Sequence, residues 1–127
     1  MKRSQVVKKL DSVFSEFIRK RDMDSKGFNT CFTCGKVAHW KELQCGHFQS
    51  RKHYATRWDE QNCQVQCVGC NMFKQGEQFK FGVNLDKKYG VGVAETLEKI
   101  ARFTIKFSTK ELEEKYEYYR GLNSDNK

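Results

Sequence analysis

Two C-x-x-C pairs carry the strongest chemical signal in this sequence. The first pair is Cys31 and Cys34, the second is Cys67 and Cys70, and 32 residues separate them. Four thiolates from two such pairs can meet at one tetrahedral Zn²⁺, because each short pair turns on itself and the chain between them returns as a hairpin. A site closed by four thiolates has no open position for water. This zinc would therefore hold the frame of the domain without doing chemistry itself.

Chemistry is predicted instead for residues between the pairs and directly after them. Hydrolysis of a phosphodiester by water needs a base of near-neutral pKa and a cation that neutralises charge on the leaving oxygen. His47 can supply the base, and the amide oxygen of Asn71 suits a hard cation such as Mg²⁺ or Mn²⁺. The alternatives are a structural or zinc-binding His47 beside Cys45, and an Asn71 that merely caps a helix. The leading interpretation is a nuclease centre.

The charge balance favours a nucleic-acid partner. The chain has 24 Lys and Arg against 16 Asp and Glu, a net charge of +8, which suits a polyanion better than an acidic protein or a small neutral ligand. Basic residues that flank the proposed centre are expected to contact DNA phosphates, and they are Arg51, Lys52, Arg57 and Lys74. Tyr54 and Trp58 either stack on bases at an opened junction or pack over the zinc site.

The N-terminus predicts neither export nor a membrane span. Lys2 and Arg3 are not followed by a continuous apolar run. We therefore expect a reducing cytoplasm, where six cysteines favour metal binding over disulfides. Cys45 and Cys63 are left over by the two pairs. Each is either a spare ligand or a small core residue, and the core role is favoured.

The elements that position these residues follow from periodicity. Apolar residues at offsets of three and four predict an N-terminal helix over residues 4–21, with Ser4 as its N-cap. Short strands are expected within residues 36–49, with His47 on the second of them. A long polar, basic and aromatic loop over residues 50–61 follows, and loops of this kind are usually kept for function.

The second half of the chain is expected to be mainly helical. A strand from Cys63 to Cys67 comes first, and Asn71 is expected to open a helix that runs toward Phe79. Further helices are predicted for residues 79–89, 93–103 and 109–122, the first ending at Gly90 and the last capped by the segment that begins at Ser108. We therefore expect a single domain with an N-terminal helix in 1–24, a zinc-stapled core in 28–80 and C-terminal helices in 81–122.

Several spaced motifs resemble one family. His47, Asn62 and Asn71 around Cys67-x-x-Cys70 resemble the pattern of zinc-stapled HNH, or ββα-metal, endonucleases. More closely, motifs in one order resemble the lambdoid phage NinG family, also called Rap. These motifs are Phe17-Ile18-Arg19-x-Arg21-Asp22, Cys31-x-Thr33-Cys34-Gly35-Lys36, Gly46-His47-Phe48-x-Ser50-Arg51, Arg57-x-Asp59-Glu60-x-Asn62 and Gln66-Cys67-x-x-Cys70-Asn71. The similarity covers nearly the whole chain.

The resemblance implies a metal-dependent endonuclease of phage recombination in the host cytoplasm. Its substrates would be branched DNA such as D-loops and Holliday junctions. His47 would be the general base, Asn62 would orient it, and Asn71 would bind a catalytic Mg²⁺ or Mn²⁺. The implied fold is α+β, with a zinc-stapled ββα-metal (HNH-like) core between an N-terminal helix and C-terminal helices.

One position departs from the pattern of the wider class. Many HNH enzymes place an acidic metal ligand directly before the base, where this chain has Gly46. Glycine has no side-chain donor. Either Asp59 or Glu60 reaches the ion, or Asn71 holds it with only water and DNA phosphates.

Two other functions compete with the nuclease. One is a non-catalytic, zinc-containing DNA-binding accessory protein of recombination. The other is an RNA-binding zinc ribbon, which would leave His47 and both Asn residues without a role. Symmetric cutting of a four-way junction needs two centres, which predicts a two-fold homodimer built from the helices outside the core. Phage or host recombination proteins would be further partners.

Overall fold

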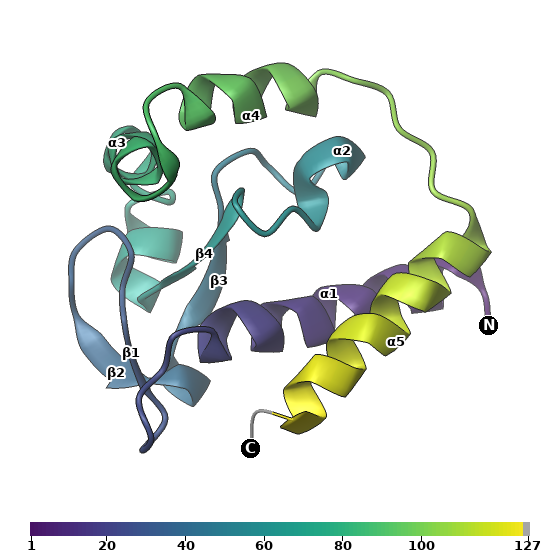
Figure 1. The fold of residues 1–127 in the computed structure, drawn as a ribbon, viewed down its shortest axis with the longest axis horizontal. Helices are drawn as coiled ribbons and strands as arrows, with labels where there is room; N and C mark the ends of the chain where they lie inside the picture. Colours follow the sequence, from purple (N-terminus) through teal and green to yellow (C-terminus); the bar gives the residue numbers. More distant parts are fainter. Residues whose placement is uncertain (126–127) are drawn as a thin grey trace.

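Two helices from opposite ends of the chain lie against each other in the computed structural model, which describes residues 1–125 (Figure 1). They are α1, Arg3–Lys20, and α5, Thr109–Asp125. The buried face of α1 repeats every four residues, through Val6, Leu10, Phe14 and Ile18. Leu112 and Tyr119 of α5 join this face in one core, in which the Phe14 and Tyr119 rings meet edge to face at 4.9 Å.

The predicted helix of residues 4–21 is confirmed, but the prediction of Ser4 as its N-cap is wrong. Ser4 lies inside the first turn of α1, and Lys2 is the flanking residue. The side-chain Oε1 of Gln5 accepts a hydrogen bond from the Lys2 N–H at 3.2 Å. Near the other end of the chain, the Ser108 Oγ accepts from the Glu111 N–H at 3.0 Å and caps α5 as expected.

The first cysteine pair lies in the turn of an antiparallel hairpin. Its strands are β1, Phe28–Thr30, and β2, Val37–His39, and a short 3-10 turn, η1, Trp40–Glu42, follows. Gly35 closes the turn with a φ of +80°, a conformation that favours glycine. The Gly35 N–H donates to the Cys31 carbonyl at 3.0 Å.

A second antiparallel pair forms the centre of the molecule. It joins β3, Gln44–His47, to β4, Cys63–Gln66, with His47 opposite Cys63. The long loop between these strands contains one short helix, α2, Tyr54–Arg57. Both strands pack against α1. The structure therefore confirms the strand predicted for His47 and the strand predicted from Cys63.

The helix predicted to run from Asn71 toward Phe79 is wrong. Asn71 lies in a π-helical turn, η2, Gly69–Phe73, and the next helix, α3, begins only at Gln78. The three residues 75, 76 and 77 all have positive φ, between 50° and 85°, which a right-handed helix does not accommodate. The Gly76 N–H donates instead to the Cys70 carbonyl at 2.8 Å, so the chain folds back over the second cysteine pair.

The remaining helices pack against each other, and the second of them also packs against α2. They are α3, Gln78–Tyr89, which ends at Gly90 as predicted, and α4, Val93–Ala101, which ends two residues before its predicted boundary. Phe81, Leu85 and Leu97 pack between them. The predicted α+β class is confirmed, with helices around two small antiparallel sheets. Within residues 1–125, no helix combines the length and apolar character that crossing a bilayer requires.

Candidate functional site

The four cysteines of the two pairs converge at one point. The sulfurs of Cys31, Cys34, Cys67 and Cys70 all lie within 4.8 Å of one another, and the Sγ atoms of Cys34 and Cys67 are 3.7 Å apart. Tetrahedral coordination with Zn–S bonds of about 2.3 Å places ligand sulfurs about 3.8 Å apart. The cluster therefore fits a structural zinc ion in both donor type and spacing.

Thr33 connects this cluster to the second sheet. Burial raises the pKa of the Cys31 thiol, but hydrogen bonds from the Thr33 hydroxyl and the backbone of Cys67 outweigh it and lower that pKa to about 6. The Thr33 Oγ1 also accepts a hydrogen bond from the Gln66 amide at 3.1 Å, so the cluster and β4 share one polar network.

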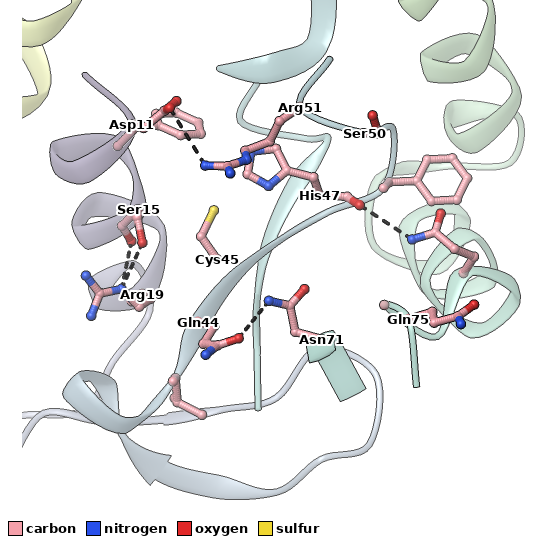
Figure 2. Close-up of a pocket in the computed structure, with 15 residues that line it drawn as sticks. Asp11, Ser15, Arg19, Gln44, Cys45, His47, Ser50, Arg51, Asn71 and Gln75 are labelled. Carbon is pink, nitrogen blue, oxygen red and sulfur yellow. Dashed lines mark hydrogen bonds and ion pairs between the residues drawn. The ribbon is translucent and has the colours of Figure 1, made fainter. Parts of the chain in front are cut away.

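An open cleft of about 730 Å³ lies beside β3 (Figure 2). One wall is α1, with Asp11, Ser15 and Arg19, and the floor is β3. The remaining lining comes from the segments after β3 and after the second cysteine pair. His47, Arg51 and Asn71 all line this cleft. The structure thus brings together the proposed base, the proposed metal ligand and one proposed phosphate contact from separate parts of the sequence.

His47 is held as a neutral imidazole. Burial lowers its pKa to about 4, and the nearby Arg51 cation acts in the same direction. A hydrogen bond with the Arg57 backbone and the charge of Asp11 oppose this shift without cancelling it. A neutral ring at physiological pH has a nitrogen lone pair that can accept a proton.

Asn62 is fully buried and holds both ends of the loop between β3 and β4. Its Oδ1 accepts from the Gln49 N–H at 2.8 Å, and its Nδ2 donates to the Gln49 and Thr56 carbonyls at 3.1 and 3.0 Å. The loop that Asn62 holds carries Arg57, whose backbone bonds to His47. Asn62 thus ties the start of this loop, at Gln49, to Thr56, the residue before Arg57.

Asn71 and Gln44 meet at the base of the cleft (Figure 2). The Asn71 Nδ2 donates to the Gln44 Oε1 at 2.8 Å, which leaves the Asn71 Oδ1 as the atom that a cation would take. Asn71 is held at this place by the π-helical turn, in which its N–H donates to the Cys67 carbonyl at 3.0 Å. The second cysteine pair therefore fixes the proposed metal ligand directly.

Gly46 leaves its side-chain space to Gln66. A Cβ on Gly46 would lie far inside van der Waals contact with the Gln66 Oε1. Because the Gln66 Nε2 donates to the Gly76 carbonyl at 2.9 Å, its oxygen must point the other way, toward Gly46. That oxygen is buried and has no hydrogen-bond partner in the described residues. An acidic residue at position 46 is thus excluded by the packing of Gln66.

Asp59 and Glu60 lie away from the cleft lining. The Asp59 Oδ1 accepts from the backbone N–H groups of Gln61 and Asn62, at 2.8 and 3.0 Å. The Glu60 Oε2 accepts from the Tyr119 hydroxyl at 2.9 Å, and burial together with this bond raises the Tyr119 pKa. Both carboxylates hold the loop and α5 in place.

Sequence reasoning missed Asp11. Its carboxylate receives the Arg57 guanidinium through two nitrogens and the Trp58 Nε1 at 2.9 Å, and it lies 3.7 Å from Arg51. Arg57 therefore pairs with α1, although a phosphate contact was predicted for it. Trp58 is in the core with Phe14. Arg51, Lys52 and Lys74 are exposed.

The comparison with known families covers the entire sequence. Residues 1–127 match the family model described as Bacteriophage Lambda NinG protein. The chain belongs to the NinG family. It is 31% identical over 99 residues to the ninG proteins of Salmonella phage P22 and Escherichia phage 933W, and 30% identical over the same length to that of Escherichia phage lambda.

These alignments cover 76% of this chain and 45–46% of each relative, so the chain spans about half the length of the relatives it matches. No solved structure matches it. The NinG family predicted from the spaced motifs is thus confirmed. The HNH class and the roles of His47, Asn62 and Asn71 stay predictions.

Proposed function

We propose that this NinG protein is a divalent-metal-dependent endonuclease that cuts branched DNA recombination intermediates such as Holliday junctions and D-loops. In this proposal β3, β4 and the turn that carries Asn71 serve as a zinc-stapled ββα-metal core. One observation carries the proposal. A neutral, half-buried His47 and the free amide oxygen of Asn71 line the same open cleft, which Arg51 borders with positive charge.

In the proposed reaction His47 accepts a proton from the attacking water. The water oxygen forms a bond to phosphorus as the bond from phosphorus to one sugar oxygen breaks, and that oxygen leaves with the electron pair. The neutral ring keeps one nitrogen lone pair, and that nitrogen is the proposed acceptor. Asn62 is a positioning residue, because it holds the loop that contacts His47.

The donors in this region are amide oxygens, which suit a hard cation. Asn71 lines the cleft. The buried Gln66 Oε1, which has no hydrogen-bond partner within residues 1–125, lies beside Gly46, where an acidic ligand would otherwise begin. A bound Mg²⁺ or Mn²⁺ would stabilise negative charge on the leaving oxygen. With so few protein ligands, water and DNA phosphates would complete the coordination.

DNA contacts are assigned to the exposed basic residues. The Arg51 side chain is 61% exposed at the mouth of the cleft, and Lys52 follows it in the same loop. Lys74 directly follows the turn that holds Asn71. Together they would bind phosphates on both sides of His47. Arg57 has no part in this proposal, because Asp11 engages it.

The test is cleavage of a labelled four-way junction and a linear duplex by the full chain, with and without Mg²⁺ or Mn²⁺. Replacing His47 with Ala should slow junction cleavage by about 10²- to 10⁴-fold, the usual contribution of a general base, while the zinc of the four-cysteine cluster and junction binding persist. His53→Ala is the matched control. It removes a histidine that directly precedes α2 in the same loop, outside the lining of this cleft.

Two results would refute the proposed nuclease function. The wild-type chain could bind junctions without cutting them under any divalent metal, which is the behaviour expected of an accessory DNA-binding protein. Alternatively, His47→Ala could cut as fast as the wild type.

A further inference from the structure

A second group of soft donors lies outside the four-cysteine cluster. The Sγ atoms of Cys45 and Cys63 and a ring nitrogen of His47 lie within 4.8 Å of one another. Strand register explains their convergence. His47 stands directly opposite Cys63 across the two strands, and Cys45, two residues before His47, lies on the same face of β3.

The donor set is one that zinc uses in open sites. Two thiolates and one imidazole, with a fourth position left for another ligand, form a known zinc coordination pattern. Bonds of about 2.3 Å to sulfur and 2.1 Å to nitrogen would place these donors about 3.6–3.8 Å apart. Side-chain shifts of about 1 Å would therefore close the site from the arrangement observed, without a change in strand register.

The surroundings leave one side of this group open. Cys63 is fully buried in the core that α1 and α5 form, with the Asn62 amide 3.9 Å from its sulfur. Cys45 and His47 are half-buried and line the cleft, and Figure 2 shows both of them in that lining. A metal held by the three side chains would thus have its fourth position toward the cleft, where a water molecule or a phosphate could bind.

We propose that Cys45, His47 and Cys63 form a second, open site for a soft divalent cation such as Zn²⁺, and that filling it removes His47 from base catalysis. A ring nitrogen that binds a metal has no lone pair left for a proton. The site itself is independent of the proposed nuclease function. Only its inhibitory effect rests on that function.

Zinc stoichiometry of the full chain tests the site. Wild-type protein, loaded with excess Zn²⁺ under reducing conditions and freed of unbound metal, should retain two zinc ions per chain by elemental analysis. Cys45→Ser should retain one, because a hydroxyl is a poor zinc donor. Ser15→Ala is the matched control, since Ser15 lines the α1 wall of the cleft without belonging to the group, and it should retain two.

Cobalt gives an independent readout of the thiolates. Charge-transfer absorption scales with the number of sulfurs bound to Co²⁺, so losing two of six should lower it by about one third in Cys45→Ser. Because Cys45 is only half-buried, we expect Cys45→Ser to fold. Circular dichroism of the same samples checks this. One retained zinc in the wild type, with cobalt absorption unchanged by Cys45→Ser, would overturn the site.

Inhibition is measured separately from binding. Added Zn²⁺ should slow junction cleavage by the wild type and by Ser15→Ala, and it should slow Cys45→Ser much less. Equal slowing of all three would overturn the inhibitory effect, whatever the stoichiometry. If the wild type never cuts, the proposed nuclease fails, while the zinc and cobalt measurements still decide whether the site exists.

Discussion

Replacing Asp11 with Ala should destabilise this protein by about 3 kcal/mol and loosen the loop beside His47. The Asp11 carboxylate is 20% exposed, and the Arg57 side chain that it binds is 15% exposed. Truncation would leave a mostly buried guanidinium without its counter-charge. It would also remove the acceptor of the Trp58 Nε1, whose side chain is in the core.

The magnitude follows from this burial. Exposed ion pairs contribute about 0.2–1 kcal/mol, whereas removing one partner of a buried pair costs about 3–5 kcal/mol. The pair is about four-fifths buried, so we place the cost of breaking it between these two ranges, at about 2 kcal/mol. The unpaired Trp58 N–H adds about 1 kcal/mol or more. Asp11→Asn should cost less, because its amide oxygen can still accept one of these hydrogen bonds.

Urea unfolding of the zinc-loaded chain measures the effect. Glu98→Ala is the control, because it breaks a single bond of 2.9 Å to Arg102 in an ion pair whose side chains are both more than half exposed. We expect the control to change the free energy of unfolding by less than about 0.5 kcal/mol. If Asp11→Ala changed the free energy of unfolding as little as the control does, the proposed role of Asp11 in holding Arg57 and Trp58 would be refuted.

Three further predictions concern the metal cluster, the glycine and the base. Cys34→Ser should abolish zinc retention and unfold the chain, because zinc binding contributes about 10 kcal/mol or more in small zinc-binding peptides; elemental analysis and circular dichroism check this. Gly46→Ala should lower the free energy of unfolding by about 1–3 kcal/mol by displacing Gln66, and the same substitution in a Gln66→Ala background should cost less. Burial lowers the pKa of His47 to about 4 from 6.5, so the stability that its neutral form contributes is complete above pH 6.5 and declines as the pH falls toward 4. The free energy of unfolding of the wild type should therefore fall, relative to that of His47→Gln, as the pH is lowered from 6.5 toward 4. A constant difference between the two proteins would contradict this prediction.

Local signals explain what could be predicted from the sequence. The four-residue repeat that ends at Ile18, the cysteine pairs and the Gly90 helix end each depend on neighbours within a few positions, and all are present in the structure. The position of His47 on a strand also follows from nearby alternation. Such features need no knowledge of tertiary contacts.

Features that depend on contacts between residues far apart in the sequence could not be predicted. The bond between Asp11 and Arg57 joins residues 46 positions apart, and nothing near either residue marks it. Gln75 and Glu77 have positive φ without being glycine, so the break between η2 and α3 has no clear sequence signal. The apolar residues of α1 that suggested a dimer surface are used in the core with α5, so a homodimer stays a prediction and would need another surface.

The zinc cluster and the strand at the floor of the cleft are connected by a short chain of hydrogen bonds and packing contacts. The Cys31 sulfur lies 3.5 Å from the Thr33 hydroxyl, the Gln66 amide donates to that hydroxyl, and the Gln66 oxygen fills the space above Gly46. Losing the metal would therefore disturb the strand that carries His47 as well as the fold. For this reason, loss of activity in a cysteine variant would not identify a catalytic residue. A substitution at His47 alters none of these contacts between the zinc cluster and Gly46. It therefore separates catalysis from zinc-dependent folding.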